Sequence, residues 1–465
     1  MRFPAWITAL TALITAAVVI VIAQAVLQPN RPLILAAKFD SPTITPNADG
    51  VDDVTSFRYE LSRNADITLS LRGADNSEYV FRDKQPRVAQ AYAVLFSGVV
   101  DGYTRPDEAI EGIVERRLLA NGEYHWTLTA QNAAEAQTMD GTITIADANS
   151  HLPVISTFTI GPSIFSPNQD GVADRVDIEV YLEQPADLRV FLVGAQGQEY
   201  PISARKEGRQ PGEAGRQMFD YEGGIDLNAE PPPDGTYKVV AVAQDAEGQR
   251  VRRETDLTIV DGGKPLAEIS AQSVGVDVLF QPQPYDDKYF ADAKTRGALV
   301  DQITDPAARS NVSIVMPVGD MLVFMLTIEN YSNVPIRTTG PTPGTVYQQN
   351  QVAASLGAFE SPGAWRVGIQ CDTSTEPFPY RWAVGSPDVL IEKTNPGTGE
   401  VFSYLPAGAR ALVWGAVRMT DIQERQNPQN CWAGLIQEQV EVSLRNSVVG
   451  QREIRLVDAT AESAK

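Results

Sequence analysis

The chain has few of the residues that catalysis and metal binding use most. Its 465 residues include only 2 histidines and 2 cysteines. No GxSxG, HExxH, P-loop or GxGxxG pattern marks a nucleophile, a zinc site or a nucleotide site. His125 falls inside an expected strand and His151 lies in the inter-module linker, two residues before Pro153. We therefore predict that the protein is not an enzyme. The catalytic alternative is a glycosidase-like pair of carboxylates, because no sequence motif marks such a pair.

Positive charge is also scarce. The 38 basic residues are outnumbered by 59 acidic ones, which gives a net charge of −21. Such a surface repels phosphate backbones, and no basic stripe interrupts it, so we predict no binding to nucleic acid. The hydrophobic content of 43% is sufficient for packed cores. A chain of this length typically forms about three domains.

The N-terminal segment lacks charge altogether. From Pro4 to Leu27 no residue is charged, and Arg2 precedes this run. An apolar stretch of this length is typical of a membrane-spanning helix, and the leading arginine predicts export of everything that follows. Ala23-Gln24-Ala25 resembles a cleavage site, so a removed signal peptide is the alternative. We predict a signal anchor or signal peptide plus spacer over residues 1–32. A retained anchor would hold the rest of the chain at the cell surface through the membrane, whereas a cleaved signal peptide would leave it secreted.

The two cysteines, Cys371 and Cys431, both lie in the C-terminal part of the chain. A single pair in an oxidising compartment predicts a disulfide. The alternative is two separate buried thiols. Neither cysteine has a CxxC partner or a neighbouring histidine, so a zinc site is not expected.

One motif occurs twice. Residues 46–53 read PNADGVDD, and residues 167–174, 121 positions later, read PNQDGVAD. A second pair follows in the same order, with NGEY at residues 121–124 and DGTY at residues 234–237. Two signatures repeated in order at the spacing of a small domain indicate a tandem duplication.

Alternating apolar and polar residues predict strands throughout both copies. The expected strands are residues 55–61, 67–72, 124–130 and 141–145, then 176–182, 188–192, 237–243 and 257–260. The third segment repeats the strand signal at residues 321–330, 410–418 and 440–444, whereas residues 287–302 could form a helix or a loop. We predict an all-β chain with immunoglobulin-like β-sandwiches at 33–149 and 150–263 and a distinct β-sandwich at 264–465.

The repeated signature resembles that of a known module. Phe165–Asp174 and Asp234–Gly248 match the pattern FSPNxDGVxD…DGxYxVxAxAxDxxG, which is similar to the immunoglobulin-like domain of flagellar hook-capping proteins. The first copy departs from it, because Thr43-Ile44-Thr45 replaces Phe-Ser and Asn132-Ala133-Ala134 lacks the glycine. The resemblance covers residues 33–261. It implies a sandwich fold used by secreted bacterial proteins for spacing, sorting or docking, and it names no ligand.

The PNxDG loops are the first candidate site. Oxygens that converge from a tight turn are typical of calcium sites. The candidate ligands are Asn47, Asp49, Asp53, Asn168, Asp170 and Asp174. An EF-hand-like spacing would require an acid where Thr45 and Ser166 stand. The interpretation we favour is therefore structural: these side chains form Asx turns and bind loop amides.

Aromatic residues in the C-terminal domain are the second candidate site. Trp365, Tyr380 and Trp382 could stack on a sugar or anchor a protein, or they could pack in the core. We expect Trp382 to be partly exposed. The sequence thus favours a non-enzymatic surface protein whose immunoglobulin-like repeats form a stalk for a C-terminal domain that binds a protein or glycan partner. The alternative is a carbohydrate-binding protein that uses these aromatics.

Overall fold

A computed structural model describes residues 5–27, 31–105, 108–205, 212–271, 275–290, 296–304, 313–395, 397–442 and 444–458. Helix α1 (Ala5–Leu27) comes first, and strands dominate the remainder, so the all-β prediction is confirmed. Residues 1–4 and 28–30 of the expected anchor lie outside the described ranges. In the ranges given, no helix combines the length and the hydropathy needed to cross a membrane. The anchor or signal stays a prediction.

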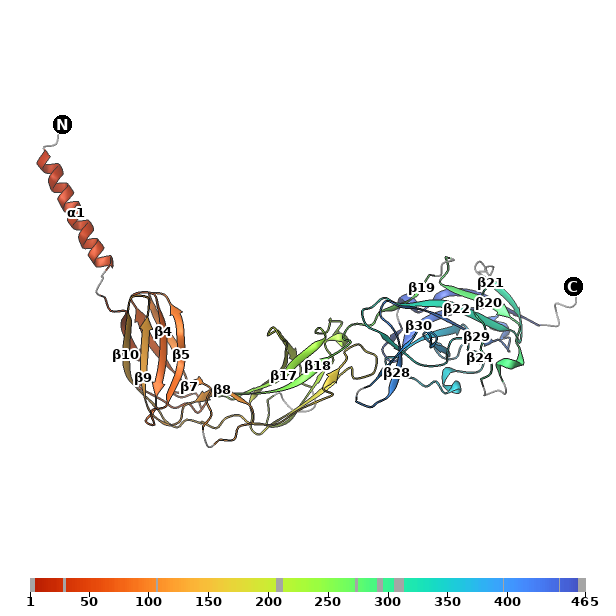
Figure 1. Cartoon of the computed structure of the whole chain (residues 1–465), viewed down its shortest axis with the longest axis horizontal. Coiled ribbons are helices and arrows are strands. Elements are labelled where there is room, and N and C mark those ends of the chain that lie inside the picture. The colour runs from red at the N-terminus through yellow and green to blue at the C-terminus, as the bar shows by residue number, and fades with distance from the viewer. Residues whose placement is uncertain are drawn as a thin grey trace.

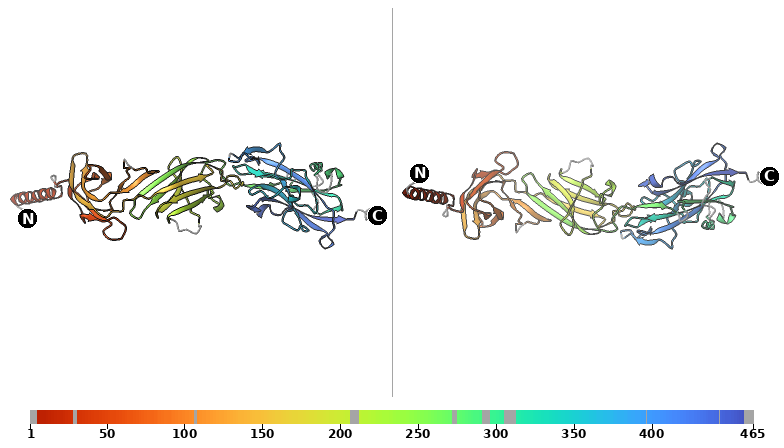
Figure 2. Two further views of the ribbon diagram at one scale, coloured as in Figure 1. Left: turned by 90° about the horizontal axis from the view of Figure 1, so that it is seen from below. Right: turned by 90° about the horizontal axis from the view of Figure 1, so that it is seen from above.

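Three β-units follow the helix in a row, with α1 at one end of the row and the C-terminal domain at the other (Figure 1; Figure 2). The first unit packs a sheet in the order β1-β3-β6 against one in the order β2-β10-β9-β4-β5. Its strands are β1 (Ile34–Phe39), β2 (Thr43–Ile44), β3 (Thr55–Leu61), β4 (Ala65–Arg72), β5 (Glu78–Arg87), β6 (Ala91–Phe96), β9 (Gly122–Gln131) and β10 (Ala136–Ile145).

Residue alternation explains this sandwich. In β3, Phe57, Tyr59 and Leu61 are buried, whereas the residues between them face outward. Successive side chains of a strand point to opposite faces, so one face of β3 enters the core. Trp126 of β9 meets Phe57 edge-on at 5.1 Å between ring centroids, which joins the two sheets.

The second unit repeats the plan of the first. A sheet in the order β11-β13-β16 faces the sheet β15-β14-β17-β18, and β12 pairs with β18 in parallel as β2 pairs with β10. The strands are β11 (Ile155–Gly161), β12 (Ile164–Phe165), β13 (Val176–Leu182), β14 (Asp187–Val193), β15 (Glu199–Ile202), β16 (Gly215–Tyr221), β17 (Gly235–Gln244) and β18 (Arg250–Ile259), with the 3-10 turn η1 (Ile225–Leu227).

One hairpin departs from the expected domain plan. Strands β7 (Val99–Asp101) and β8 (Ile113–Leu118) belong by sequence to the first module, which was expected to span residues 33–149. They instead continue the second module's sheet, where β8 pairs with β18. The first module therefore contributes strands to its neighbour.

The C-terminal domain stacks a sheet in the order β19-β22-β29-β24 on a larger one in the order β21-β32-β30-β25-β23-β28-β27. Of its expected strand at 440–444, Glu441–Val442 is extended, Leu444 begins a 3-10 turn (Leu444–Asn446), and residue 443 lies outside the described ranges. Within 287–302 the described ordered piece is a short 3-10 turn at Asp287–Tyr289. The strands are β19 (Ala267–Ser270), β20 (Val278–Gln283), β21 (Ser313–Pro317), β22 (Met321–Asn330), β23 (Ile336–Thr338), β24 (Val346–Gln348), β25 (Trp365–Cys371), β26 (Tyr380–Ala383), β27 (Ile391–Thr394), β28 (Val401–Leu405), β29 (Arg410–Arg418), β30 (Gln429–Gln437), β31 (Glu441–Val442) and β32 (Val449–Val457).

Candidate functional site at the domain junctions

The first PNxDG loop is held by hydrogen bonds of its own. The Asp53 carboxylate accepts backbone N–H groups from Asn47 at 3.0 Å, Ala48 at 2.8 Å and Gly50 at 2.7 Å. Asp49 accepts the Val51 N–H at 2.8 Å. The Asp49 bond, like the bond from the Asp49 N–H to Asn47 Oδ1 at 3.1 Å, is an Asx turn expected from the sequence, and Asp53 satisfies the loop amides.

The second loop has a similar but not identical set of bonds. Asp174 accepts the N–H groups of Gly171 and Asp170 at 2.5 and 3.2 Å, and Asp170 accepts the Val172 N–H at 2.8 Å. In both loops the backbone therefore directs partly positive N–H groups at the carboxylates that a calcium ion would need. Over the described ranges, no cluster of three or more His, Cys, Asp or Glu side chains is placed to hold a metal. These hydrogen bonds account for both loops as structural turns, and calcium binding stays a prediction.

The surroundings of the two loops differ. In the first loop Ala48, Asp49 and Gly50 are exposed. In the second loop Asn168 and Asp170 are only 2% and 5% exposed, because the C-terminal domain covers them. One sequence motif thus forms a bare loop in one module and a domain junction in the other.

Three side chains of the C-terminal domain bind the second loop. Arg337 of β23 donates through Nε to the Asp170 carbonyl oxygen at 2.5 Å. Tyr404 of β28 donates its hydroxyl to Asp170 Oδ2 at 2.9 Å, and Gln437 of β30 donates to the carbonyl oxygen of Gln169 at 2.7 Å. Backbone oxygens and one carboxylate oxygen of the loop are thereby satisfied where water is excluded.

The backbones also approach closely at this junction. Gly171 has φ +83°, and a Cβ built there would lie 2.1 Å from the carbonyl oxygen of Pro362. Gly363 has the same constraint, since its Cβ would lie 2.2 Å from the carbonyl carbon of Asp170. At the equivalent Gly50, φ is +87° and a Cβ would meet nothing within 4 Å. Close backbone approach therefore distinguishes the docked loop from the bare one.

Burial changes the electrostatics of the docked loop. Desolvation by burial, with the nearby Asp170 as the second cause, raises the pKa of Asp174 to about 7. Desolvation also raises the pKa of Asp170, against the hydrogen bond from Tyr404. At the equivalent Asp53, which no other domain covers, desolvation is the largest single cause, but the backbone N–H bonds together outweigh it and the pKa is lowered. Similar backbone hydrogen bonds thus accompany opposite pKa shifts, because desolvation and the Asp170 charge dominate in the docked loop.

The junction between the two modules is built differently. The β7–β8 hairpin extends the second sheet through the register Val114↔Val251 and Ile113↔Arg252. Arg252 and Arg250 lie near Glu115 at 3.6 and 3.7 Å. The two modules thus share one continuous sheet.

A buried polar network supports this hairpin. Gln249, which has no exposed surface, accepts the Leu118 N–H at 3.2 Å and donates to the His151 carbonyl oxygen at 2.8 Å. Arg117 is 1% exposed and forms a bidentate ion pair with Glu108. Because a buried polar group without a partner is costly, separating the modules would be opposed by Gln249, whose bond to Leu118 crosses the junction.

The expected aromatic site of the C-terminal domain is not a surface site. Trp365, Tyr380 and Trp382 are 3%, 5% and 0% exposed, so the expectation that Trp382 is partly exposed was wrong. The Trp382 indole N–H donates to the Thr345 carbonyl oxygen at 3.0 Å, and its ring meets Phe324 at 4.6 Å. These rings form the sandwich core, so the carbohydrate-binding alternative loses the residues on which it rested.

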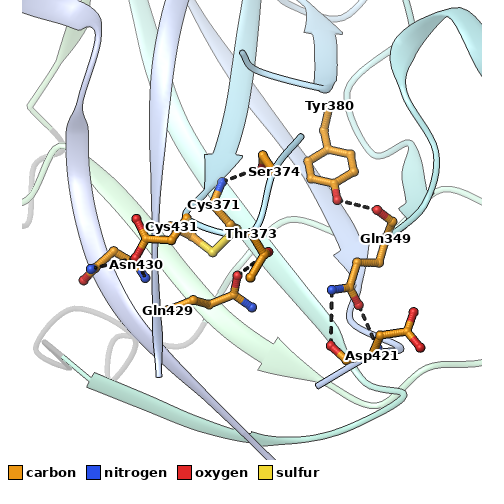
Figure 3. Close-up of a disulfide and its surroundings, with 10 residues drawn as sticks. Gln349, Cys371, Thr373, Ser374, Tyr380, Asp421, Gln429, Asn430 and Cys431 are labelled. Atoms are coloured by element: carbon orange, nitrogen blue, oxygen red, sulfur yellow. Dashed lines mark hydrogen bonds between the residues drawn. A yellow bond between two sulfur atoms is a disulfide. The ribbon is translucent and has the colours of Figure 1, made fainter. Parts of the chain in front are cut away.

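The cysteines form the expected disulfide. Cys371 and Cys431 face each other on the paired strands β25 and β30, and their sulfurs are bonded (Figure 3). Beside the disulfide, the Cys371 N–H donates to Ser374 Oγ at 3.0 Å. Tyr380 points away from solvent and donates to the Gln349 carbonyl oxygen at 2.7 Å. This end of the domain is therefore cross-linked and closed.

Sequence reasoning missed the residues that build the second junction. Arg337 and Tyr404 lie outside every recognised motif, and each reaches a loop more than a hundred positions earlier in the chain. The nearest sequence signal was the FSPNxDGVxD motif itself. It located one side of the junction without indicating that anything docks there.

Comparisons with known proteins do not assign the chain to a family. No family model matches it. No curated protein matches it. Among solved structures, a chimeric titin Z1Z2-Z1Z2 tandem functionalised with a GRGDS peptide from fibronectin is 13% identical, with a TM-score of 0.19, over 48% of this chain and 100% of that one. A mutant of Salmonella alpha-2-macroglobulin is 12% identical, with a TM-score of 0.18; the match covers 92% of this chain, which spans 23% of that protein. At these scores the immunoglobulin-like sandwich architecture rests on the sheets described above.

Proposed function

We propose that the chain is a non-enzymatic extracytoplasmic surface protein, anchored by its N-terminal segment, in which two immunoglobulin-like modules form a stiff stalk for the C-terminal domain. The observation that carries this proposal is that both junctions of the row are fastened, one by a shared sheet and the other by a buried loop. The uncharged segment from Pro4 to Leu27 supports anchoring, with cleavage and secretion as the alternative.

Fastened junctions matter because domains joined only by linkers move relative to one another by default. Here Asp261 to Pro265 would be such a linker, yet Lys393 of the C-terminal domain pairs with Asp261 at 2.7 Å. The linker itself is therefore held. A row of domains stiffened in this way would keep the last domain at a fixed distance from the anchor.

The likeness of the repeated signature to the hook-capping module supports the same role. In that group the immunoglobulin-like domain is associated with spacing, sorting and docking, and the second copy here matches the signature more fully than the first. We extend the proposal accordingly: the C-terminal domain is presented to a protein partner in an envelope or appendage assembly.

Electron microscopy of the negatively stained full chain tests the stalk. We expect elongated particles with three lobes in line and a length on the order of 100 Å, from the size of compact domains. Particles with the three lobes collapsed together, or with freely varying angles between them, would refute the proposal.

A pair of conservative variants makes the test specific. Tyr404→Phe removes the hydroxyl that binds Asp170. The distribution of angles between the second module and the C-terminal domain should therefore be broader than in the wild type. Tyr347→Phe removes a hydroxyl that donates to the Arg381 carbonyl oxygen inside the C-terminal domain, and should leave the angle unchanged. Angle distributions of equal width in both variants would show that the buried loop does not stiffen the row.

A further inference from the structure

A pocket of about 480 Å³ opens on the C-terminal domain. One wall contains the 3-10 turn η4 (Ala353–Leu356) and continues to Glu360, the other runs from Glu376 to Arg381, and Arg366 of β25 also lines it. This volume falls within the roughly 300–1,000 Å³ typical of ligand pockets. None of the aromatic residues expected from the sequence to bind a ligand lines it.

The floor of this pocket is held by two arginines that share one buried carboxylate. Arg366 is 1% exposed, and it donates through Nε to the Thr339 carbonyl oxygen at 2.9 Å and through Nη2 to the Phe359 carbonyl oxygen at 2.6 Å. Arg381 donates through Nη1 to Glu438 Oε1 at 2.8 Å. These bonds fix the floor and also fix the backbone of Phe359 at the rim.

One donor of the floor is left over. Arg366 Nη1 lies 3.3 Å from Glu438 Oε1, yet within the ranges given above it has no hydrogen-bond partner. A buried donor without a partner costs free energy. A peptide carbonyl oxygen that entered the pocket would satisfy this donor.

The rim carries an exposed ring and two exposed carboxylates. Phe359 is 71% exposed, and no other phenylalanine, tyrosine or tryptophan of the described side chains is more exposed. The Glu360 side chain is 62% exposed and accepts from Gln439 Nε2 at 3.2 Å, and Glu376 is exposed on the opposite wall. An aromatic face attracts a cation, and so do carboxylates beside it.

We propose that this pocket binds a basic segment of a protein partner. A lysine or arginine side chain of that segment lies on Phe359 beside Glu360 and Glu376, and a backbone carbonyl oxygen of the same segment accepts a hydrogen bond from Arg366. This inference rests on the proposed function, because it gives the chemistry of the protein partner to which the C-terminal domain is presented.

Charge selects a basic occupant over an acidic one. The two arginines of the pocket stand against three glutamates, Glu360, Glu376 and the buried Glu438, which leaves a net charge of −1 that one cation neutralises. An acidic occupant would instead meet the two exposed carboxylates of the rim. The net charge of −21 on the whole chain also attracts a basic partner from a distance.

Fluorescence anisotropy on the full chain in detergent tests the pocket. The probes are short labelled peptides with apolar and proline residues around a central arginine, lysine, norleucine or glutamate. The arginine and lysine peptides should bind with a Kd on the order of 100 μM, and the other two at least tenfold more weakly. Added salt should weaken the binding, because the rim carboxylates are exposed.

Variants of the rim locate the binding. Phe359→Ala and Glu376→Gln should each weaken binding of the arginine peptide roughly fivefold. The matched controls are Leu227→Ala, 83% exposed on the second module, and Glu392→Gln, an exposed acid of β27, and both should bind as the wild type does. Melting curves show whether all four variants fold.

The outcomes for the pocket and for the stalk are separate. No peptide binding, equal binding of the arginine and glutamate peptides, or an affinity that Phe359→Ala and Glu376→Gln leave intact would each overturn the pocket, even with elongated particles in electron microscopy. Collapsed particles that still bind the arginine peptide would refute the stalk and support the pocket.

Discussion

Replacing two equivalent glycines would separate the cost of a loop conformation from the cost of losing a junction. Gly50 and Gly171 have φ values of +87° and +83°, so alanine is strained to the same degree in both. The surroundings differ: the new methyl meets nothing within 4 Å at Gly50 and lies 2.1 Å from the Pro362 carbonyl oxygen at Gly171. Gly50→Ala is therefore an internal control for Gly171→Ala.

The magnitudes follow from these contacts. The left-handed conformation costs an alanine about 1–2 kcal/mol in either loop. At Gly171 the methyl also requires the C-terminal domain to shift by roughly 1 Å, because carbon and oxygen do not approach within about 3 Å. That shift would stretch the bonds from Arg337 and Tyr404 to Asp170, now 2.5 and 2.9 Å, beyond hydrogen-bonding range. Each involves a charged group and contributes about 1.5–3 kcal/mol, so the junction should lose about 3–6 kcal/mol.

Distance measurement by electron spin resonance provides the assay. Spin labels at Leu227→Cys in the second module and Phe359→Cys in the C-terminal domain both occupy exposed positions, 83% and 71% accessible. We expect one narrow distance distribution in the otherwise unchanged chain and in Gly50→Ala, and a broad one in Gly171→Ala. A folded Gly171→Ala chain with the narrow distribution would refute the claim that close backbone approach holds this junction.

Three further results are expected. Replacing Cys371 and Cys431 by serine removes a link between residues 60 positions apart and should lower the free energy of unfolding of the C-terminal domain by about 4 kcal/mol in denaturant titrations; a loss below about 1 kcal/mol would contradict this chain-entropy argument. The pKa of Asp174 rises from 3.8 to about 7 on folding, so the folded chain holds this proton more tightly than the unfolded chain does. The contribution of this proton to the free energy of unfolding is therefore complete below about pH 4 and is lost as the pH rises to about 7. The melting temperature of the second module should fall across that window, less so in Asp174→Asn, and a parallel slope in both chains would exclude Asp174 as the source. Calcium or a chelator should leave the melting curve unchanged, because backbone N–H groups already occupy the Asp53 and Asp174 oxygens, and a calcium-dependent rise of several degrees would restore the metal site.

Local pattern predicted the strands well. The alternating runs at residues 55–61 and 176–182 coincide with β3 and β13, since a strand with one face in the core carries its burial pattern in its own sequence. The same reasoning failed for Trp382. Trp382 was expected to be partly exposed, whereas it lies on β26, which pairs with β25, and its ring is fully buried.

The β7–β8 hairpin lay beyond local reasoning for a different reason. Its second strand reads IVERRL and shows no clear alternation, because one edge rests on β18 while Arg117 is buried by its pairing with Glu108. What makes it a strand is a partner more than a hundred residues later. Pairing between strands so far apart in the chain is determined by the assembled sheet. The module boundaries predicted from the repeat therefore did not show that this hairpin joins the second module.

The PNxDG motif predicts a turn but does not predict docking. Its asparagine, aspartates and glycine are all accounted for by the turn they build, since both copies make the same internal bonds. The motif would therefore persist in a module whether or not anything docks on it. Docking depends instead on Arg337, Tyr404 and the close approach of Pro362, which belong to another domain. It follows that a search for further docked loops of this type should test the neighbouring domain for a buried arginine and tyrosine at its sheet end, because the loop sequence carries no information on that point.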